Sequence, residues 1–249
     1  LSPASSELTQ QSVRNIFQDS QGFVWLLTQE GVHRFDGYTV IRFRASNKEE
    51  GGLSHQSTTG IVEDSQGFIW IATAGGGVNK YDPADHSFSA IRSGAEMSEK
   101  TLISDTIYSL FKDPDGSIWI GYDIPGVFSR INPGTGNLKH YRLPADNEQP
   151  LGRISGFSSD PQGRLFAASK NGYLIDVTAY LNGGIGYVTS ISDYIGDRFD
   201  NLSDIDFSED GWLWIASLDH GLVRINRSNA EYSHFSGRRP LDSIDISDP

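Results

Sequence analysis

The stretch that decides the fold is Asp19-Ser20-Gln21-Gly22-Phe23-Val24-Trp25, because close copies of it recur along the chain. The second copy runs from Asp64 to Trp70 and the third from Asp113 to Trp119. The fourth copy ends in Phe166 instead of Trp, and the fifth begins with Ser208 instead of Asp. The motif glycines stand at positions 22, 67, 116, 163 and 211, so successive copies are 45 to 49 residues apart. A near-constant period of this length is the signature of a repeat architecture.

Each part of the motif has a local physical role. An aspartate side chain accepts a hydrogen bond from the backbone two residues on and starts a turn, and the glycine supplies the left-handed residue of a hairpin. The apolar run that follows, such as Phe68 to Ala72, is too hydrophobic for an exposed strand. We expect the tryptophan to pack against the next repeat. The residues with structural roles are Asp19, Gly22, Trp25, Asp64, Gly67, Trp70, Asp113, Gly116, Trp119, Asp160, Gly163, Gly211 and Trp214.

Each repeat has room for four strands. One short strand precedes the motif, one contains its tryptophan, and a third begins near a second glycine. A more polar fourth strand closes the repeat, as expected of an outer edge. The predicted fourth strands are 39–43, 88–92, 138–143, 187–192 and 231–236. Four antiparallel strands per repeat predict an all-β fold, a β-propeller in which one domain spans 1–249. Its five blades are centred near 19–25, 64–70, 113–119, 160–166 and 208–214.

The fourth repeat departs from the others. It inserts ten residues, 177–186, between Asp176 and Tyr187. Two interpretations remain open: a blade that has diverged without a new role, or a blade modified to build a site.

Composition limits the possible functions. The chain has 249 residues with 32 acidic against 20 basic, a formal net charge of -12, so we expect no nucleic-acid partner. The one adjacent basic pair is Arg238-Arg239. No cysteine is present, which excludes disulfides, thiolate metal sites and cysteine nucleophiles. No stretch reaches the roughly 18 apolar residues of a membrane span.

The motifs of common catalytic and metal sites are missing. The aspartate spacing does not match a calcium-binding EF-hand loop, and no His-x-His or His-Glu-x-x-His pair appears among six histidines. No Gly-x-Ser-x-Gly nucleophile elbow appears either. We therefore expect no catalytic residue, no metal and no cofactor. A pair of carboxylates suited to glycoside hydrolysis stays possible, because its separation is set in space.

The candidate ligand-binding residues lie where the repeats differ. The loops between the second and third strands vary in sequence while the strands beside them repeat, which is typical of binding residues carried on a common scaffold. Innermost strands add side chains that face the propeller channel. The candidates are Arg14, Glu30, Tyr108, Tyr122, Asp123, Lys170, Asp219 and His220. Ordinary solvated loops remain the competing interpretation.

The repeats resemble the two component regulator propeller family. The resemblance is carried by 12–37, 61–83 and 107–133, which combine Asp-x-x-Gly-x-x-Trp with Gly-x-x-x-x-Asp or Asn. It covers all five repeats and weakens at Phe166. It implies the periplasmic or otherwise extracytoplasmic sensor region of a bacterial membrane receptor. The implied output is a histidine kinase phosphorelay, often a hybrid, or a diguanylate cyclase, and the implied ligand is a small molecule or glycan.

Family propellers often have seven blades, so we expect five repeats to be a fragment of a larger ring, with a closed five-bladed ring as the alternative. The tail 239–246 resembles the first strand of a further blade. An open ring has exposed strand edges through which a homodimer can form. Two alternatives remain: a propeller enzyme resembling a polysaccharide lyase or glycoside hydrolase, and a protein-binding propeller.

Overall fold

The computed structural model describes residues 12–45, 52–144 and 151–235, and in these it shows five four-stranded antiparallel sheets. The first blade contains β1 Val13–Gln18, β2 Val24–Thr28, β3 Gly31–Phe35 and β4 Val40–Phe43. The second contains β5 Thr58–Glu63, β6 Ile69–Thr73, β7 Val78–Asp82 and β8 Ser87–Ile91. The third contains β9 Ile107–Lys112, β10 Ile118–Tyr122, β11 Val127–Ile131 and β12 Leu138–Arg142. The fourth blade contains β13 Ile154–Ser159, β14 Leu165–Ser169, β15 Tyr173–Asp176 and β16 Val188–Ser190. The fifth contains β17 Leu202–Phe207, β18 Leu213–Ser217, β19 Gly221–Asn226 and β20 Glu231–Phe235. Strand order follows the sequence within every sheet, which confirms the predicted β-propeller blades.

The chain divides into two compact units, 1–156 and 157–249. The first unit contains the first three blades and the second contains almost all of the last two, with the boundary inside β13. The prediction that one domain spans 1–249 stays a prediction. The tail 239–246 and the pair Arg238-Arg239 lie outside the described residues.

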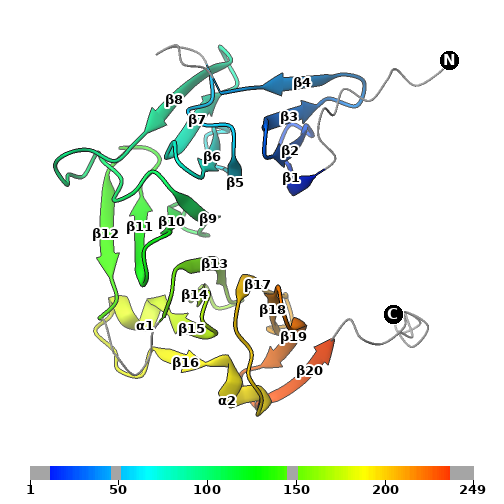
Figure 1. Cartoon of the computed structure of the whole chain (residues 1–249), viewed down its shortest axis with the longest axis vertical. Helices are drawn as coiled ribbons and strands as arrows, with labels where there is room; N and C mark the ends of the chain where they lie inside the picture. Colours follow the sequence, from blue (N-terminus) through cyan, green and yellow to red (C-terminus); the bar gives the residue numbers. More distant parts are fainter. Residues whose placement is uncertain (1–11, 46–51, 145–150, 236–249) are drawn as a thin grey trace. The chain divides into compact units, whose positions relative to one another are not determined.

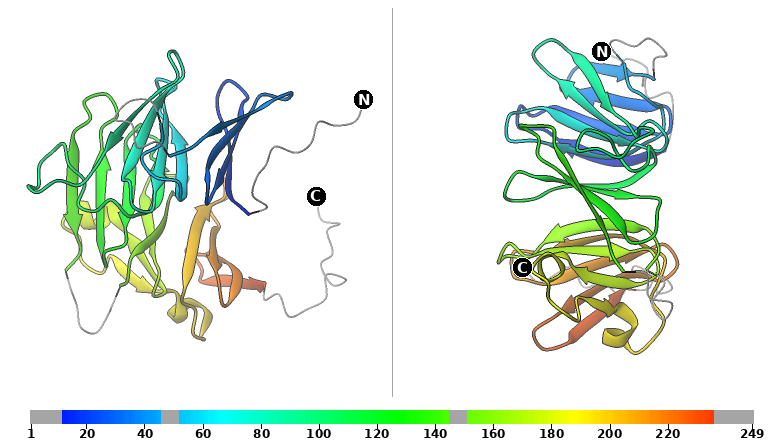
Figure 2. Two further views of the ribbon diagram at one scale, coloured as in Figure 1. Left: turned by 45° about the horizontal axis from the view of Figure 1, so that its top comes forward. Right: turned by 90° about the vertical axis from the view of Figure 1, so that its left-hand side faces the viewer.

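In the first unit each blade has its first strand inside and its fourth strand outside (Figures 1 and 2). Trp25 and Leu27 of the first blade share a buried cluster with Ile71 and Tyr81 of the second. Trp70 in turn packs among Ile118 and other residues of the third blade. The prediction that the motif tryptophan packs against the next blade is confirmed for these two residues.

The motif aspartate does more than start its turn. One oxygen of Asp19, Oδ1, accepts hydrogen bonds from the backbone N–H groups of Gln21 at 3.0 Å and Phe23 at 2.9 Å. The other oxygen accepts a bond from the Trp25 indole Nε1 at 2.7 Å. Asp64 repeats the arrangement with Trp70 at 2.8 Å. The motif is therefore one hydrogen-bonded unit that joins the turn to the buried ring.

The two irregular repeats change this unit in different ways. In the fourth repeat Phe166 has no polar atom, and Arg164 Nε donates to Asp160 Oδ2 at 2.7 Å in place of an indole. In the fifth, Ser208 replaces the aspartate, and its hydroxyl donates to the Trp212 carbonyl at 3.1 Å. Trp214 is left without an indole hydrogen bond in the described part of the chain.

The prediction of a strand at 187–192 is wrong in its second half. Strand β16 covers only Val188–Ser190, and a short helix, α2 Ile191–Ile195, follows it. The helix ends at Gly196, whose φ of 71° suits a left-handed cap. It buries Ile191 and Ile195, one turn apart, in the core of the second unit. The first five inserted residues form another short helix, α1 Val177–Leu181, and the Asp176 side chain caps its N-terminus.

Candidate ligand-binding site

The loops between second and third strands lie where the sequence predicts them, at 29–30, 74–77 and 123–126 in the first unit. Backbone hydrogen bonds fix the second and third of these loops to the segments that lead into inner strands. Ala74 N donates to the Ser57 carbonyl at 2.9 Å, and Gly75 N donates to the Asp105 carbonyl at 3.0 Å. These loops therefore form a platform held by backbone contacts.

A β-bulge interrupts the inner strand of each blade in the first unit at the same place. The ladder register shifts around Arg14 in β1, around Thr59 in β5 and around Tyr108 in β9. A bulge leaves one residue unpaired and re-aims its side chain, and bulges are frequent beside functional sites. Arg14 and Tyr108, which the sequence analysis selected, are both bulge residues.

The bulge residues occupy neighbouring strands. Arg14 Nη1 donates to Ser57 Oγ at 3.5 Å, at the start of β5. A Cβ on Gly60 of β5 would lie 3.1 Å from the Leu110 Cβ of β9, so these two strands are in contact. Beyond β9, Ser109 Oγ donates to the Ile154 carbonyl at 3.3 Å. The three bulge residues therefore stand at equivalent positions of inner strands that contact one another in turn.

Arg153 completes this group. Its guanidinium carbon lies 3.9 Å from the ring centroid of Tyr108, a cation–π distance. Tyr108 remains 38% exposed. Arg153 Nε and Thr59 Oγ1 are buried atoms without a hydrogen-bond partner. We call Arg14, Thr59, Tyr108 and Arg153 the inner-edge cluster.

Two predicted residues of the first unit lie in loops and already have partners. Glu30 forms an ion pair with Arg42, whose Nη2 lies 2.8 Å from its carboxylate. Asp123 is exposed and accepts a hydrogen bond from Ser104 Oγ at 3.0 Å. Both carboxylates stay at the loop end of their blades, and their role in binding stays a prediction.

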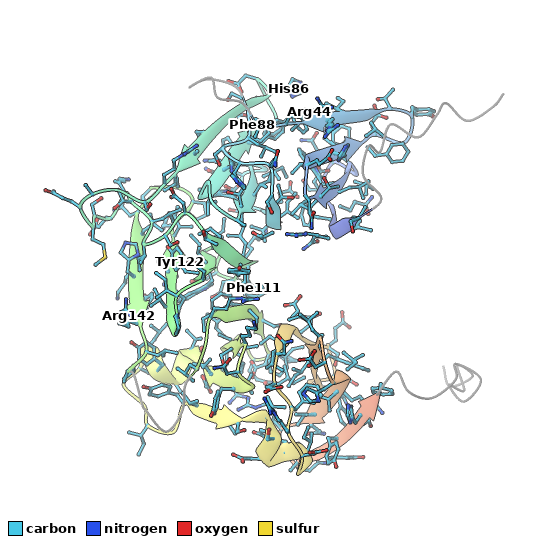
Figure 3. The ribbon with its side chains drawn as sticks, viewed as in Figure 1. Arg44, His86, Phe88, Phe111, Tyr122 and Arg142 are labelled. Carbon is cyan, nitrogen blue, oxygen red and sulfur yellow. The ribbon has the colours of Figure 1, made fainter. Side chains whose placement is uncertain are left out.

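Tyr122 requires a correction. Figure 3 labels Tyr122 in the third blade. Its side chain is fully buried, and its hydroxyl donates to Ser129 Oγ at 2.8 Å. Burial raises the pKa of Tyr122 to about 12. Tyr122 ends β10 and joins the core shared with the second blade, so it does not offer a ligand an exposed ring.

The other three predicted residues belong to the second unit. Asp219 Oδ2 accepts from Asn201 Nδ2 at 2.8 Å, and His220 Nε2 lies 3.0 Å from Asp200 Oδ1. The Lys170 carbonyl accepts from Leu202 N at 3.0 Å. These contacts tie the β18–β19 and β14–β15 loops to the segment that enters β17.

The opposite end of the third blade carries two hollows that the sequence did not indicate. Turns of residues 113–117 and 132–137 line them together with parts of β11 and β12, and their volumes are about 190 and 430 Å³. Ser117 and Asn132 belong to both. Arg130 forms an ion pair with Asp115 at this end.

Thr59 and Arg153 are the members of the inner-edge cluster that the sequence analysis missed. Thr59 was detectable, since Arg14, Thr59 and Tyr108 each stand five residues before a motif aspartate. Arg153 had no such signal, because it lies just before β13 and reaches Tyr108 through space.

The described residues contain no group of three or more His, Asp or Glu side chains placed to hold a metal ion. Over the same residues, no helix has the length and apolar character needed to cross a bilayer.

The chain is similar to one family of repeats and to several solved structures. The model of the two component regulator propeller matches residues 7–30, 52–75 and 101–123. No curated protein sequence matches the chain. Among solved structures, the extracellular domain of a hybrid two component system from B. thetaiotaomicron has 22% identity and a TM-score of 0.75 over 91% of this chain. The extracellular domain of a one component system from the same bacterium has 23% identity and a TM-score of 0.69 over 90% of the chain.

A third similar structure is an enzyme. Virginiamycin B lyase from Staphylococcus aureus, in a catalytically inactive form with quinupristin, has 18% identity and a TM-score of 0.67, covering 94% of this chain and 73% of its own. At these identities the likeness concerns the fold alone. The chain spans about 30% of the length of the first two structures. It is a propeller domain like those extracellular domains, and its sequence carries repeats of the two component regulator propeller family.

Proposed function

We propose that this chain is the ligand-sensing, extracytoplasmic propeller of a bacterial membrane signal-transduction receptor. The output is a phosphorelay of the hybrid histidine kinase type, with a diguanylate cyclase as the alternative output. The proposal rests on the match of three repeats to the two component regulator propeller. It is supported by the inner-edge cluster, in which Arg153 Nε and Thr59 Oγ1 have no hydrogen-bond partner within the described residues. The ligand is a small molecule or glycan bound without chemical change.

The inner-edge cluster suits a sensor because its members come from successive blades. Arg14 lies in the first blade, Thr59 in the second and Tyr108 in the third. A ligand that contacts all three changes the free energy of packing between blades. It shifts an equilibrium between two states only by its difference in affinity for them. Such a shift is the signal that the rest of the receptor would transmit.

An enzyme is the second candidate, and the likeness to virginiamycin B lyase is the observation that favours it. A lyase or glycoside hydrolase needs an acid and a base at one centre. The inner-edge cluster as defined above supplies a tyrosine but neither a carboxylate nor a histidine, the commonest acid–base groups. We therefore place binding before catalysis.

The experiment is a thermal-shift screen of the chain against a broad panel of oligosaccharides, nucleosides, amino acids and organic acids. The proposal predicts a saturable rise in the unfolding temperature for a small set of related compounds, with each compound recovered unchanged. A flat response across the panel contradicts ligand sensing, and appearance of a cleaved product contradicts the absence of catalysis.

A further inference from the structure

We propose that this chain associates head to tail, with the fifth blade of one copy packed against the first blade of a second copy. In the first unit the second blade packs one sheet face against the first blade and its other face against the third. We call the face toward the preceding blade the leading face and the face toward the following blade the trailing face. The proposed contact joins the trailing face of the fifth blade to the leading face of the first, and it does not depend on ligand binding.

The contact between the first two blades shows which residues make up each face. The trailing face of the first blade contributes the aromatic and aliphatic side chains of Trp25, Leu27, Val32 and Phe43. The leading face of the second blade contributes the side chains of Ile61, Ile69, Ile71 and Tyr81. Burial of these two apolar faces against each other removes both from water and stabilises the pair of blades.

The fifth blade carries the same trailing face, but part of it is exposed. The residues equivalent to Trp25, Leu27, Val32 and Phe43 are Trp214, Ala216, Leu222 and Phe235. The register agrees, because Leu222 pairs with Phe235 as Val32 pairs with Phe43. Val32 is fully buried, whereas Leu222 is 36% exposed and Phe235 is 44% exposed. A contiguous exposed apolar patch marks an interaction site.

An arginine on the trailing face repeats as well. Arg224 pairs with Trp214 across the ladder, as Arg34 pairs with Trp25. The guanidinium carbon lies 5.8 Å from the indole centroid in both blades. Arg34 also donates from Nη1 to the Tyr81 hydroxyl of the second blade at 3.1 Å. The fifth blade therefore has both the apolar and the cationic part of a face that packs against a following blade.

The first blade supplies the complementary leading face. The residues equivalent to Ile61, Ile69, Ile71 and Tyr81 are Ile16, Val24, Leu26 and Phe35. Ile16 pairs with Leu26 as Ile61 pairs with Ile71. Ile61 is 6% exposed, whereas Ile16 is 67% exposed, and Leu26 is half-buried. Phe35 lacks the hydroxyl of Tyr81, so it would meet Arg224 of the other copy through its ring face.

The repeat identifies the occupant of these two faces. In the first unit a trailing face is covered by the leading face of another blade, at both contacts described above. Repeat proteins normally end in capping repeats with a polar outer face. In the described residues neither the first nor the fifth blade ends in such a face. A second copy brings a leading face of matching residues, and such a contact between two different surfaces is heterologous.

Sedimentation equilibrium of the chain at increasing concentration measures the contact. The average mass of the wild type should rise with concentration. Ile16→Glu and Leu222→Glu each place a carboxylate in the apolar contact, and each should raise the dissociation constant about tenfold or more. Ile185→Glu is the matched control, because Ile185 is 96% exposed and belongs to neither face, so it should associate as the wild type does. Circular dichroism and the unfolding temperature check that each variant is folded.

A mixture of the two variants tests the direction of the contact. Ile16→Glu keeps an intact trailing face, and Leu222→Glu keeps an intact leading face. An equimolar mixture should therefore form a one-to-one dimer at a concentration where each variant alone is a monomer. Association of either variant alone as tight as that of the wild type would indicate a contact between like faces and would overturn the head-to-tail arrangement.

The remaining outcomes are equally decisive. A wild-type chain that stays monomeric at every concentration overturns the proposal, and the chain then covers these faces itself. Association that both variants leave unchanged, or a mixture that forms no dimer, also overturns it. None of these results decides ligand sensing, which the thermal-shift screen tests separately.

Discussion

Trp25 Nε1 donates a 2.7 Å hydrogen bond to Asp19 Oδ2, while the other oxygen of the same carboxylate holds the turn that precedes the ring. The same pair recurs as Trp70 with Asp64 at 2.8 Å and Trp119 with Asp113 at 3.0 Å. The carboxylates of Asp19 and Asp64 each accept three hydrogen bonds, which compensate the buried charge. The six-residue spacing of the motif is therefore a hydrogen-bond constraint as well as a turn and a packing constraint.

The first prediction concerns the coupling of these two residues. Trp70→Phe and Asp64→Asn should each destabilise the chain by about 2 kcal/mol, because a buried charge-assisted bond is lost. The double variant should cost less than the sum, with a coupling of about 1 kcal/mol, in urea unfolding. Trp214→Phe is the control and should cost less, since Ser208 stands where the aspartate would be. Full additivity of the Trp70 and Asp64 changes would refute the coupling.

The second prediction concerns the fourth blade, where an arginine takes the place of the indole. Arg164 Nε and Nη2 both lie 2.7 Å from Asp160 Oδ2. The Arg164 side chain is 50% exposed, so solvent weakens the pair, and Arg164→Met should cost about 1 kcal/mol. Arg198→Met, which breaks a pair whose arginine is 80% exposed, should cost less than about 0.5 kcal/mol. Equal effects of the two changes in urea unfolding would show that Asp160 does not need a partner.

The third prediction separates two glycines of the first blade. Gly22 has φ of 88° and open space where a Cβ would be, so Gly22→Ala should cost only the left-handed strain of about 1–2 kcal/mol. Gly31 has φ of 118°, and a Cβ there would lie 2.3 Å from the Phe43 carbonyl oxygen. Gly31→Ala should cost clearly more, because β3 must move away from β4. Thermal unfolding of both variants checks the order, and a reversed order would contradict the blade geometry.

The fourth prediction concerns pH. Hydrogen bonds from Thr39 and from the Tyr38 backbone lower the pKa of Asp36 to about 2. A carboxyl whose folded pKa lies below its unfolded value of about 3.9 contributes stability above that value and loses it as pH falls through the folded pKa. The stability difference between wild type and Asp36→Asn should therefore shrink between pH 4 and pH 2. A difference that does not change over this range would contradict the shift.

The fifth prediction assigns different roles to two tyrosines. Tyr122→Phe removes a buried 2.8 Å bond to Ser129 and should cost about 1 kcal/mol of stability without changing ligand affinity. Tyr108→Ala should weaken ligand binding, because it removes a part-exposed ring of the inner-edge cluster, which also packs against Arg153. Denaturant unfolding and calorimetry on both variants test this, and a loss of affinity in Tyr122→Phe would restore Tyr122 to the site.

The repeat made the blades predictable, because turn chemistry and strand length are local. Strand β6, Ile69–Thr73, lies within one residue of the predicted apolar run from Phe68 to Ala72. The helix at Ile191–Ile195 was not predicted, since short apolar runs fit a strand or a helix until their burial is known. Tyr122 looked exposed because it borders a variable loop, whereas the direction of its side chain depends on the register with β9.

The binding site was predictable only in part. Arg14 and Tyr108 were selected as inner-strand residues, but their shared bulge depends on pairing with β2 and β10. The contact between Tyr108 and Arg153 joins residues of different repeats, which a spacing in the sequence does not show.

The most direct test of the account is hydrogen–deuterium exchange of the chain with and without the tightest ligand found by thermal shift. We predict slower exchange in the inner-strand peptides around 12–18, 57–63 and 106–112, which carry Arg14, Thr59 and Tyr108, and no change at 113–117 and 132–137. Protection confined to 113–117 and 132–137, with the inner strands unaffected, would place the ligand in the hollows of the third blade and contradict the inner-edge site.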